Sequence, residues 1–490
     1  MLFNSISFLI FFICVVFVYY CVAPKKYQYI LLFLTSYYFY MCWNAKYALL
    51  MGASTVITYM SGIGIGLIND RNSDESRNLR IKKLIVAASF ISNLGILAFF
   101  KYGNFILENV NLLTHQNFQM PFDIILPVGI SFYTFQALSY TIDVYRGDIG
   151  AEKNFIYYAV FVSFFPQLVA GPIERSGNLL KQIREEHHFN AEEFLCGFWM
   201  MLFGYFEKIV IADRVAIYVD AVFGDYSAVG GIQVVLAILG FTLQIYCDFS
   251  GYSHIAIGTA RILGVHLMDN FRQPYLATSI KDFWRRWHIS LSTWFRDYLY
   301  IPLGGNRRGS VRKHFNLMVT FLVSGLWHGA AWHYVLWGGV HGVYQILGNV
   351  LRPVKKKIIL LLHIDIHTFS HKLLQIFITF LLTSFAWLFF RAESIGKAIS
   401  MMKYAVTNWK YVGKAEVGLN APNVVLLLIA TVILITVSIL REAGIHLSGR
   451  LLVQNSWFKV MVTFIVTLSI LIFGIWGGNY DASSFIYFQF

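Results

Sequence analysis

Residues 423–440 read NVVLLLIATVILITVSIL, an almost wholly apolar run without a single charge. A helix of about 20 such residues crosses the hydrocarbon core of a bilayer. Comparable runs lie near 6–22, 27–43, 47–68, 84–102, 124–144, 155–170, 195–212, 231–247, 315–327, 332–350, 373–390 and 459–476. Because a helix satisfies its own backbone hydrogen bonds in lipid, we expect an all-α polytopic integral membrane protein with roughly 11–13 transmembrane helices.

The composition of the 490-residue chain excludes a conventional water-soluble enzyme. Apolar residues make up 57% of the sequence and charged residues 13%, about half the charged fraction of an ordinary soluble domain. Lys and Arg outnumber Asp and Glu, 39 to 26, and in membrane proteins such an excess collects in cytoplasmic loops. The net charge of +13 is therefore weak evidence for nucleic-acid binding.

Two basic clusters near the N-terminus predict the orientation of the chain. They are Lys25 and Lys26 after the first apolar run, and Arg71, Arg77, Arg80, Lys82 and Lys83 after the third. Both loops should face the cytoplasm, which leaves the N-terminus outside. A loop expected from Gly103 to Asp123 carries little charge and agrees with an outer position. The charged stretch from Glu174 to Glu193 mixes both signs, so the rule loses force there and we expect helices that lie in the interface or re-enter the membrane. Between 248 and 314 polar residues interrupt the apolar pattern.

His328 is the first candidate for a catalytic residue. It ends an apolar run in the stretch Ser324-Gly325-Leu326-Trp327-His328-Gly329-Ala330-Ala331, and polar groups in such a context usually face a cavity or the bundle interior. A neutral imidazole there could accept a proton near physiological pH, so His328 is a candidate general base. Its small neighbours leave room for a ligand or for close helix approach around a hydrogen-bonded histidine, and the spacing leaves both open.

His288 is the second candidate, in the stretch Phe283-Trp284-Arg285-Arg286-Trp287-His288-Ile289-Ser290. Nearby arginines tend to hold an imidazole neutral, and guanidinium groups bind phosphate in a bidentate manner. Arg285 and Arg286, with Arg307 and Arg308 in the glycine-rich turn 304–309, are therefore candidates for binding an anionic donor such as a coenzyme A thioester. Composition alone favours a cytoplasmic interfacial helix whose arginines reach headgroups and whose tryptophans anchor it.

The remaining histidines are assigned no catalytic role. On an unbroken helix His341 lies roughly 20 Å and about 220° from His328, so we expect it to pack instead of sharing a proton-transfer site. His363, His367 and His371 repeat every four residues, as metal ligands on a helix can. Asp365 is their only acidic neighbour and a basic run, 355–357, precedes them, so no metal site is expected.

Several of these stretches together resemble the membrane-bound O-acyltransferases. The resemblance runs from Tyr246-Cys247-Asp248-Phe249-Ser250-Gly251-Tyr252-Ser253 through 283–292 to Gly325-Leu326-Trp327-His328-Gly329-Ala330. It is closest to the bacterial branch that O-acetylates alginate and related polysaccharides, whose cousin adds D-alanine to teichoic acids. Residues 126–136 and 169–173 are also similar to that branch. The resemblance implies a single transmembrane domain over 1–490 around a central pore, with a motif-bearing core at 120–345 and an aromatic tail at 485–490.

The resemblance implies acyl transfer across a bacterial cell membrane. His328 matches the near-invariant histidine of the family, and His288 matches the second active-site histidine of its bacterial branch. The donor would be acetyl-CoA or another acyl thioester entering from the cytoplasm, with no tightly bound cofactor. The acceptor would be an extracytoplasmic polysaccharide, alginate-like, cellulose or peptidoglycan, reached directly or through an SGNH-hydrolase-type acetyltransferase partner.

The terminal Tyr487 is a candidate acyl relay, because a small partner in the D-alanylation systems ends in a similar aromatic tail. The alternative is a tail that packs into the fold. Two rival classes stay open for the whole chain, a transporter or flippase for a lipid-linked sugar and an inactive scaffold for a secreted acetyltransferase. Paired short Gly/Pro-broken segments, the sequence signature of transporter repeats, are absent, and retention of both His288 and His328 argues against the scaffold.

Overall fold

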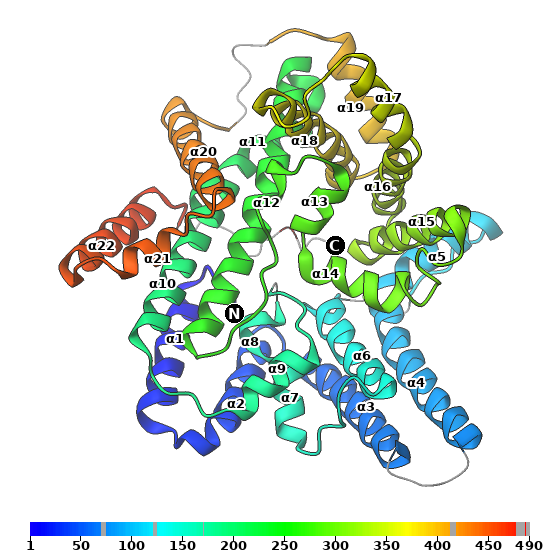
Figure 1. Cartoon of the computed structure of the whole chain (residues 1–490), viewed down its shortest axis with the longest axis vertical. Coiled ribbons are helices and arrows are strands. Elements are labelled where there is room, and N and C mark those ends of the chain that lie inside the picture. Colours follow the sequence, from blue (N-terminus) through cyan, green and yellow to red (C-terminus); the bar gives the residue numbers. More distant parts are fainter. Residues whose placement is uncertain (70–74, 121–124, 170, 412–417, 477–485, 487–490) are drawn as a thin grey trace. The chain divides into compact units, whose positions relative to one another are not determined.

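A computed structural model describes the chain except residues 70–74, 121–124, 170, 412–417, 477–485 and 487–490 (Figure 1). The described residues form helices and no β-strand, which confirms the all-α fold class. They divide into two compact units. The first unit contains Met1–Met201 and Ser253–Met268, and the second contains Leu202–Tyr252 and Asp269–Phe490.

The first unit is built mainly from the N-terminal helices. Its helices are α1 (Ile6–Phe17), α2 (Gln28–Met41), α3 (Ala45–Asn69), α4 (Glu75–Leu97), α5 (Gly103–Thr114), α6 (Ile130–Arg146), α7 (Phe155–Ser163), α8 (Phe165–Leu168) and α9 (Ser176–Arg184). The helix α3 packs against α4 and α6, and α2 packs against α7. The helix α6 is buried along most of its length, which explains why its serines, threonines and tyrosines do not face lipid.

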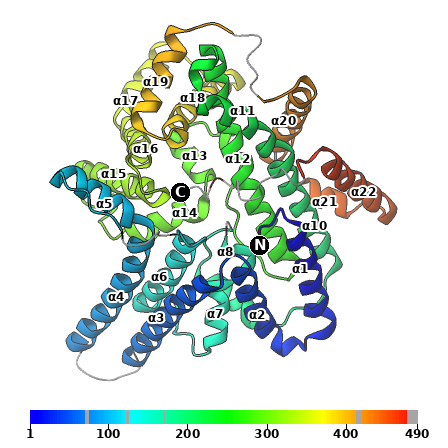
Figure 2. The same ribbon diagram turned by 180° about the vertical axis from the view of Figure 1, so that it is seen from behind.

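The second unit carries both candidate histidines. Two helices, α10 (Ala191–Tyr205) and α12 (Gly231–Ile262), have residues in both units. The others are α11 (Asp213–Gly224), α13 (Ile280–Arg286), α14 (Ile289–Phe295), α15 (Gly309–His328), α16 (Trp332–Val350), α17 (Arg352–Leu361), α18 (Phe369–Arg391), α19 (Ile395–Thr407), α20 (Ala421–Glu442), α21 (Leu447–Leu452) and α22 (Ser456–Phe473). The antiparallel helices α15 and α16 lie side by side in both ribbon views (Figure 2).

Two predicted boundaries are wrong. The span predicted to end at residue 247 continues as α12 to Ile262, since the motif 246–253 contains no proline that would end the helix. Gly251 within that motif packs closely against the backbone at Gly204 and Lys208. The loop predicted from Gly103 to Asp123 begins as helix α5, which continues α4 through a π-helical turn at Ala98–Tyr102. Residues 103–114 include leucine, isoleucine and asparagine but no proline, so Gly103 alone does not end the helix.

Seven of the described helical segments are long and apolar enough to cross a membrane. They are Ala45–Asn69, Glu75–Thr114, Ala191–Gly224, Gly231–Ile262, Phe369–Arg391, Ala421–Glu442 and Ser456–Phe473. The rest of the expected 11–13 crossings would have to use shorter or more polar helices. Those include α1 and α7, which are short, and α15, whose first turns carry Arg312 and Lys313.

Candidate active site

The hairpin of α15 and α16 places His328 inside the second unit. His328 is the last residue of α15, and extended backbone at Gly329 and Ala331 turns the chain into α16. Gly325 and Gly338 allow the two helices to touch, since a Cβ atom on Gly325 would meet the carbonyl oxygen of Tyr334 at 2.3 Å. A Cβ atom on Gly338 would meet the carbonyl oxygen of Phe321 at 2.2 Å. Of the two uses of small residues left open by the sequence, the structure has close helix approach at this seam.

Aromatic rings surround the imidazole of His328, which is 3% exposed. The ring centroids of Trp327, Trp337 and Phe390 lie 4.9, 5.0 and 5.5 Å from its own. All three rings meet it edge to face, the arrangement that aromatic pairs favour. Packing of rings from α15, α16 and α18 therefore fixes the position of His328.

His288 lies between the two short helices α13 and α14 and has an unusual backbone. Its φ of 43° and ψ of 56° fall in the left-handed region, which costs a residue with a side chain about 1–2 kcal/mol. Such strain persists only where the surroundings impose it, and it gathers at functional sites. Phe283 and Trp287 in the same stretch are buried, so the sequence alternative of an interfacial helix anchored by its tryptophans does not describe Trp287.

A hydrogen bond to Asn270 holds the imidazole of His288 in one orientation. Its Nδ1 lies 3.0 Å from Oδ1 of Asn270, which also accepts hydrogen bonds from the hydroxyl and backbone N–H of Ser290, at 2.9 and 3.3 Å. Since that amide oxygen only accepts, Nδ1 of His288 carries the proton and Nε2 has the lone pair. Burial lowers the pKa of His288 to about 3, so the imidazole is neutral at physiological pH.

Trp327 brings the two histidines to one place. Its ring centroid lies 6.2 Å from that of His288 and 4.9 Å from that of His328. The two imidazoles, 40 positions apart in the sequence, thus both contact the same indole ring. Phe249, from the motif on α12, packs edge to face on His288 with ring centroids 4.6 Å apart. Three separated sequence motifs therefore meet around this pair.

His341 also lies in this cluster, although it was predicted to be far from His328. The prediction assumed one unbroken helix, whereas the turn after His328 folds α16 back along α15. His341 and His328 consequently contact the same ring, that of Trp337, at 5.1 and 5.0 Å. The indole N–H of Trp284 donates to Nδ1 of His341 at 3.2 Å, which agrees with the packing role predicted for His341.

The four candidate arginines differ in whether acidic side chains neutralise their charge. Arg286 is half-buried and paired with Asp282 at 3.1 Å and with Glu442 at 2.7 Å. Arg285, Arg307 and Arg308 are exposed, and no ion pair involves them within the part of the chain described. Arg286 therefore forms ion pairs that connect α13 to the end of α20. The charges of the other three arginines are accessible.

Two further sequence candidates fall elsewhere. The histidine stripe is not a stripe in the fold, because α17 ends at Leu361 and His363 and His367 precede α18, which contains His371. The premise that a common helix aligns the three rings is therefore wrong. Tyr487 lies outside the described residues, whereas the neighbouring Ile486 is described and buried.

Sequence reasoning missed two polar groups of the second unit. Asn270, which orients His288, lies 18 positions before it in a segment with no recognised motif. Asp248 of the α12 motif forms a buried ion pair with Lys208 at 2.5 Å and accepts the backbone N–H of Ile486 at 2.8 Å, while Lys208 also contacts Asp213 at 2.8 Å. A buried acid in an apolar helix was the available signal, since such a charge needs a partner.

Comparison with known proteins shows the family to which the chain belongs. Residues 149–391 match the membrane-bound O-acyltransferases. The chain is 37% identical over 439 residues to a probable alginate O-acetylase of Azotobacter vinelandii, an alignment that covers 89% of this chain and 84% of that protein. The chain belongs to the membrane-bound O-acyltransferase family. As a member, it is an acyltransferase and a multi-pass membrane protein, and its reaction consumes an acyl donor as co-substrate.

Other relatives of this membrane-bound O-acyltransferase have different acceptors in their names. A peptidoglycan O-acetyltransferase of Helicobacter pylori is 34% identical over 398 residues, which cover 76% of this chain and 72% of that protein. A teichoic acid D-alanyltransferase of Bacillus subtilis is 27% identical over 248 residues, which cover 48% of this chain and 62% of that protein. The alginate and peptidoglycan relatives match more of the chain, and both are named for O-acetyl transfer.

Proposed function

We propose that the protein moves an acetyl group from a cytoplasmic thioester, acetyl-CoA or a similar donor, to hydroxyls of an extracytoplasmic polysaccharide. The observation that carries this proposal is the meeting of His288 and His328 around Trp327 in a buried, aromatic setting. Relatives named for alginate and peptidoglycan O-acetylation support a polysaccharide acceptor, with alginate-like polymers ahead of cellulose. The membrane would be the bacterial inner membrane, where cytoplasmic donor and outer acceptor are separated.

In the proposed reaction His328 acts as the general base. It takes the proton of the acceptor hydroxyl while that oxygen attacks the thioester carbonyl carbon. The carbon–sulfur bond then breaks, and the thiolate takes up a proton and leaves as the thiol of the spent donor. A base enclosed by rings and shielded from water suits this step, because competing hydrolysis of the thioester is suppressed.

His288 would orient the acceptor hydroxyl. A second histidine beside a general base has two possible roles, orientation of the reacting groups and donation of a hydrogen bond to the developing oxyanion. Because Nδ1–H of His288 is engaged by Asn270, the other nitrogen offers a lone pair and accepts a hydrogen bond. This tautomer supports orientation of the hydroxyl and disfavours donation to a developing negative charge.

The donor would bind through exposed arginines. Arg285, Arg307 and Arg308 have charges available for phosphate groups, whereas the two carboxylates beside Arg286 make it a structural residue. The polymer could receive the acetyl group directly, through Tyr487, or through an SGNH-hydrolase-type partner.

The test uses the purified full-length protein in detergent, where donor and acceptor both have access. Radiolabelled acetyl-CoA is supplied with alginate, cellulose oligosaccharides or peptidoglycan fragments, and alkali-labile ester on each polymer is counted. The proposal expects label on alginate-like polymer and release of free thiol in equal amount. Thiol release without labelled polymer would point to a missing partner, and neither product with any donor would contradict the proposal.

A further inference from the structure

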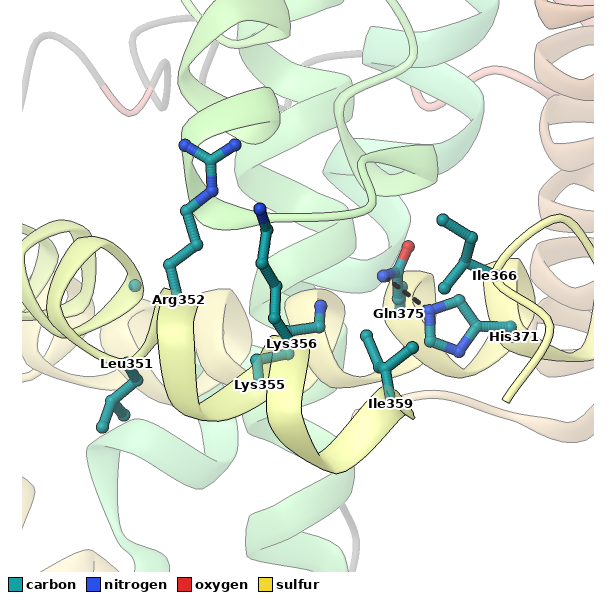
Figure 3. A pocket seen from close by; sticks show the side chains of 9 residues that line it. Leu351, Arg352, Lys355, Lys356, Ile359, Ile366, His371 and Gln375 are labelled. Atoms are coloured by element: carbon teal, nitrogen blue, oxygen red, sulfur yellow. Dashed lines mark hydrogen bonds between the residues drawn. The ribbon is translucent and has the colours of Figure 1, made fainter. Parts of the chain in front are cut away.

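A basic hollow lies among the end of α16, helix α17 and the beginning of α18 (Figure 3). Its volume is about 480 Å³, and it shares no lining residue with the histidine site. Arg352, Lys355 and Lys356 line it from α17, and His371 and Gln375 line it from α18. The sequence predicts neither a catalytic residue nor a metal site in this segment, and the proposed acyl transfer does not use the hollow.

The charge of the hollow is uncompensated. In the described portion of the protein no ion pair involves Arg352, Lys355 or Lys356. Asp365, the acid nearest in sequence, accepts the backbone N–H of His367 at 2.9 Å and so caps its own turn. Three cations around one concave surface form a site for an anion, and guanidinium and ammonium groups suit phosphate best among biological anions.

The side chains from α18 are ordered by a mutual hydrogen bond. The amide N–H of Gln375 donates to Nε2 of His371 at 3.0 Å, so the proton of the neutral imidazole sits on Nδ1 as a further donor. Figure 3 shows this pair across the hollow from the long side chains of Arg352 and Lys356. The hollow therefore combines three cations with neutral hydrogen-bond donors.

Helix α17 has an uncovered apolar side beside this hollow. None of its residues is buried, and Val354, Ile358 and Leu361, which follow one another at helical spacing, are 51%, 48% and 77% exposed. A helix with one basic and one apolar side lies at the surface of a bilayer, with the apolar side among acyl chains. The adjoining α18 is one of the membrane-crossing candidates, and in such a crossing its first turns and the hollow would lie at headgroup depth.

We propose that this hollow binds the phosphate headgroup of an anionic phospholipid, whose acyl chains lie against the apolar side of α17. Uncompensated positive charge next to exposed apolar side chains matches a lipid, which carries a phosphodiester and hydrocarbon in one molecule. A soluble phosphate would match the cations alone and leave Val354, Ile358 and Leu361 unexplained. Clusters of lysine and arginine at this depth attract the anionic lipids of the cytoplasmic leaflet.

Two adjacent lysines provide a matched experiment. Lys356 lines the hollow and Lys357 does not, although both are exposed and belong to the same basic run. The purified full-length protein is titrated with dioleoylphosphatidylglycerol or dioleoylphosphatidylcholine, and bound lipid is counted by native mass spectrometry. We expect phosphatidylglycerol to be preferred, Lys356→Gln to weaken it about fivefold, and Lys357→Gln to leave it nearly unchanged. The double variant Lys355→Gln/Lys356→Gln should weaken it further.

Three results would overturn the proposal. Equal losses in Lys356→Gln and Lys357→Gln would mean a diffuse surface charge and no built site. Equal binding of phosphatidylcholine would mean that the anionic headgroup is not recognised. Displacement of phosphatidylglycerol by inorganic phosphate at a similar concentration would make the hollow a site for soluble phosphate. Thermal unfolding of each variant in lipid-free detergent confirms that the exposed substitutions leave the protein folded, and no readout depends on acyl transfer.

Discussion

His288 and His328 are both buried in the second unit, and the contacts that surround the two imidazoles differ. The side-chain oxygen of Asn270, which also accepts from Ser290, holds His288 through a hydrogen bond that selects one tautomer. Burial keeps that imidazole neutral. Trp327, Trp337 and Phe390 hold His328 through packing, which fixes the place of the ring. The imposed tautomer of His288 suits the orienting role proposed for it, whereas the general-base role is proposed for His328.

The largest effect is expected from His328→Ala. Removing a general base typically costs about 10²–10⁴-fold in rate, so acetyl transfer should fall to near background. The matched control is His341→Gln, which contacts the same Trp337 ring and keeps an acceptor for the Trp284 N–H. Transfer is measured per folded protein, judged by thermal unfolding in detergent. Equal losses in both variants would assign His328 to packing.

A smaller but still severe loss is expected from His288→Ala. Without the lone pair of His288 the acceptor hydroxyl is misoriented, and we expect transfer to fall about 100-fold. The loss should appear in kcat with little change in the KM for the donor, because His288 is proposed to contact the acceptor. A change confined to donor KM would place His288 in donor binding.

Asn270→Ala should act through His288 and cost less. One hydrogen bond to the imidazole is lost, and about tenfold slower transfer corresponds to the ~1.4 kcal/mol of such a bond. Asn270→Asp separates positioning from general destabilisation. Its carboxylate keeps the acceptor but favours imidazolium, so the acidic limb of the pH–rate profile should move to higher pH. An unchanged profile would mean that Asn270 does not control His288.

The smallest effect on turnover is expected from Arg308→Ala, which should mainly weaken donor use. Loss of one exposed phosphate contact should raise the donor KM by about three- to tenfold and leave kcat nearly constant. Arg285→Ala is expected to behave alike. Arg286→Ala should differ, since Asp282 and Glu442 then lose their shared partner, and lower thermal stability should accompany any kinetic change. An unchanged KM in Arg308→Ala would remove that residue from the donor site.

The fold class and the family could be predicted from the sequence, because both depend on patterns that extend over many residues. Uncharged apolar runs are sufficient to predict an all-α membrane protein, and the motifs around His288 and His328 are sufficient to predict the family. The runs 315–327 and 332–350 were predicted as separate spans, but the separation of His341 from His328 was calculated on one unbroken helix, whereas both residues contact Trp337. The direction in which the chain turns at the extended Gly329 could not be predicted, because small residues fit both a continuous helix and a tight turn.

Partners that arise only in three dimensions could not be predicted. Asn270 contacts His288 where a left-handed residue joins α13 to α14, and no local sequence pattern encodes that contact. Arg286 has the same composition around it as Arg285, yet one is paired with two acids and the other is exposed. Glu442, one of those acids, lies 156 positions away in the sequence.

The most direct test of the account measures transfer across a sealed bilayer. Proteoliposomes contain radiolabelled acetyl-CoA inside and alginate outside, with the protein inserted so that its donor side faces the lumen. The account predicts that wild-type vesicles label the outer polymer while the donor stays enclosed, and that His328→Ala vesicles do not. Equal labelling by the His328→Ala protein, or labelling only after the vesicles are permeabilised, would contradict it.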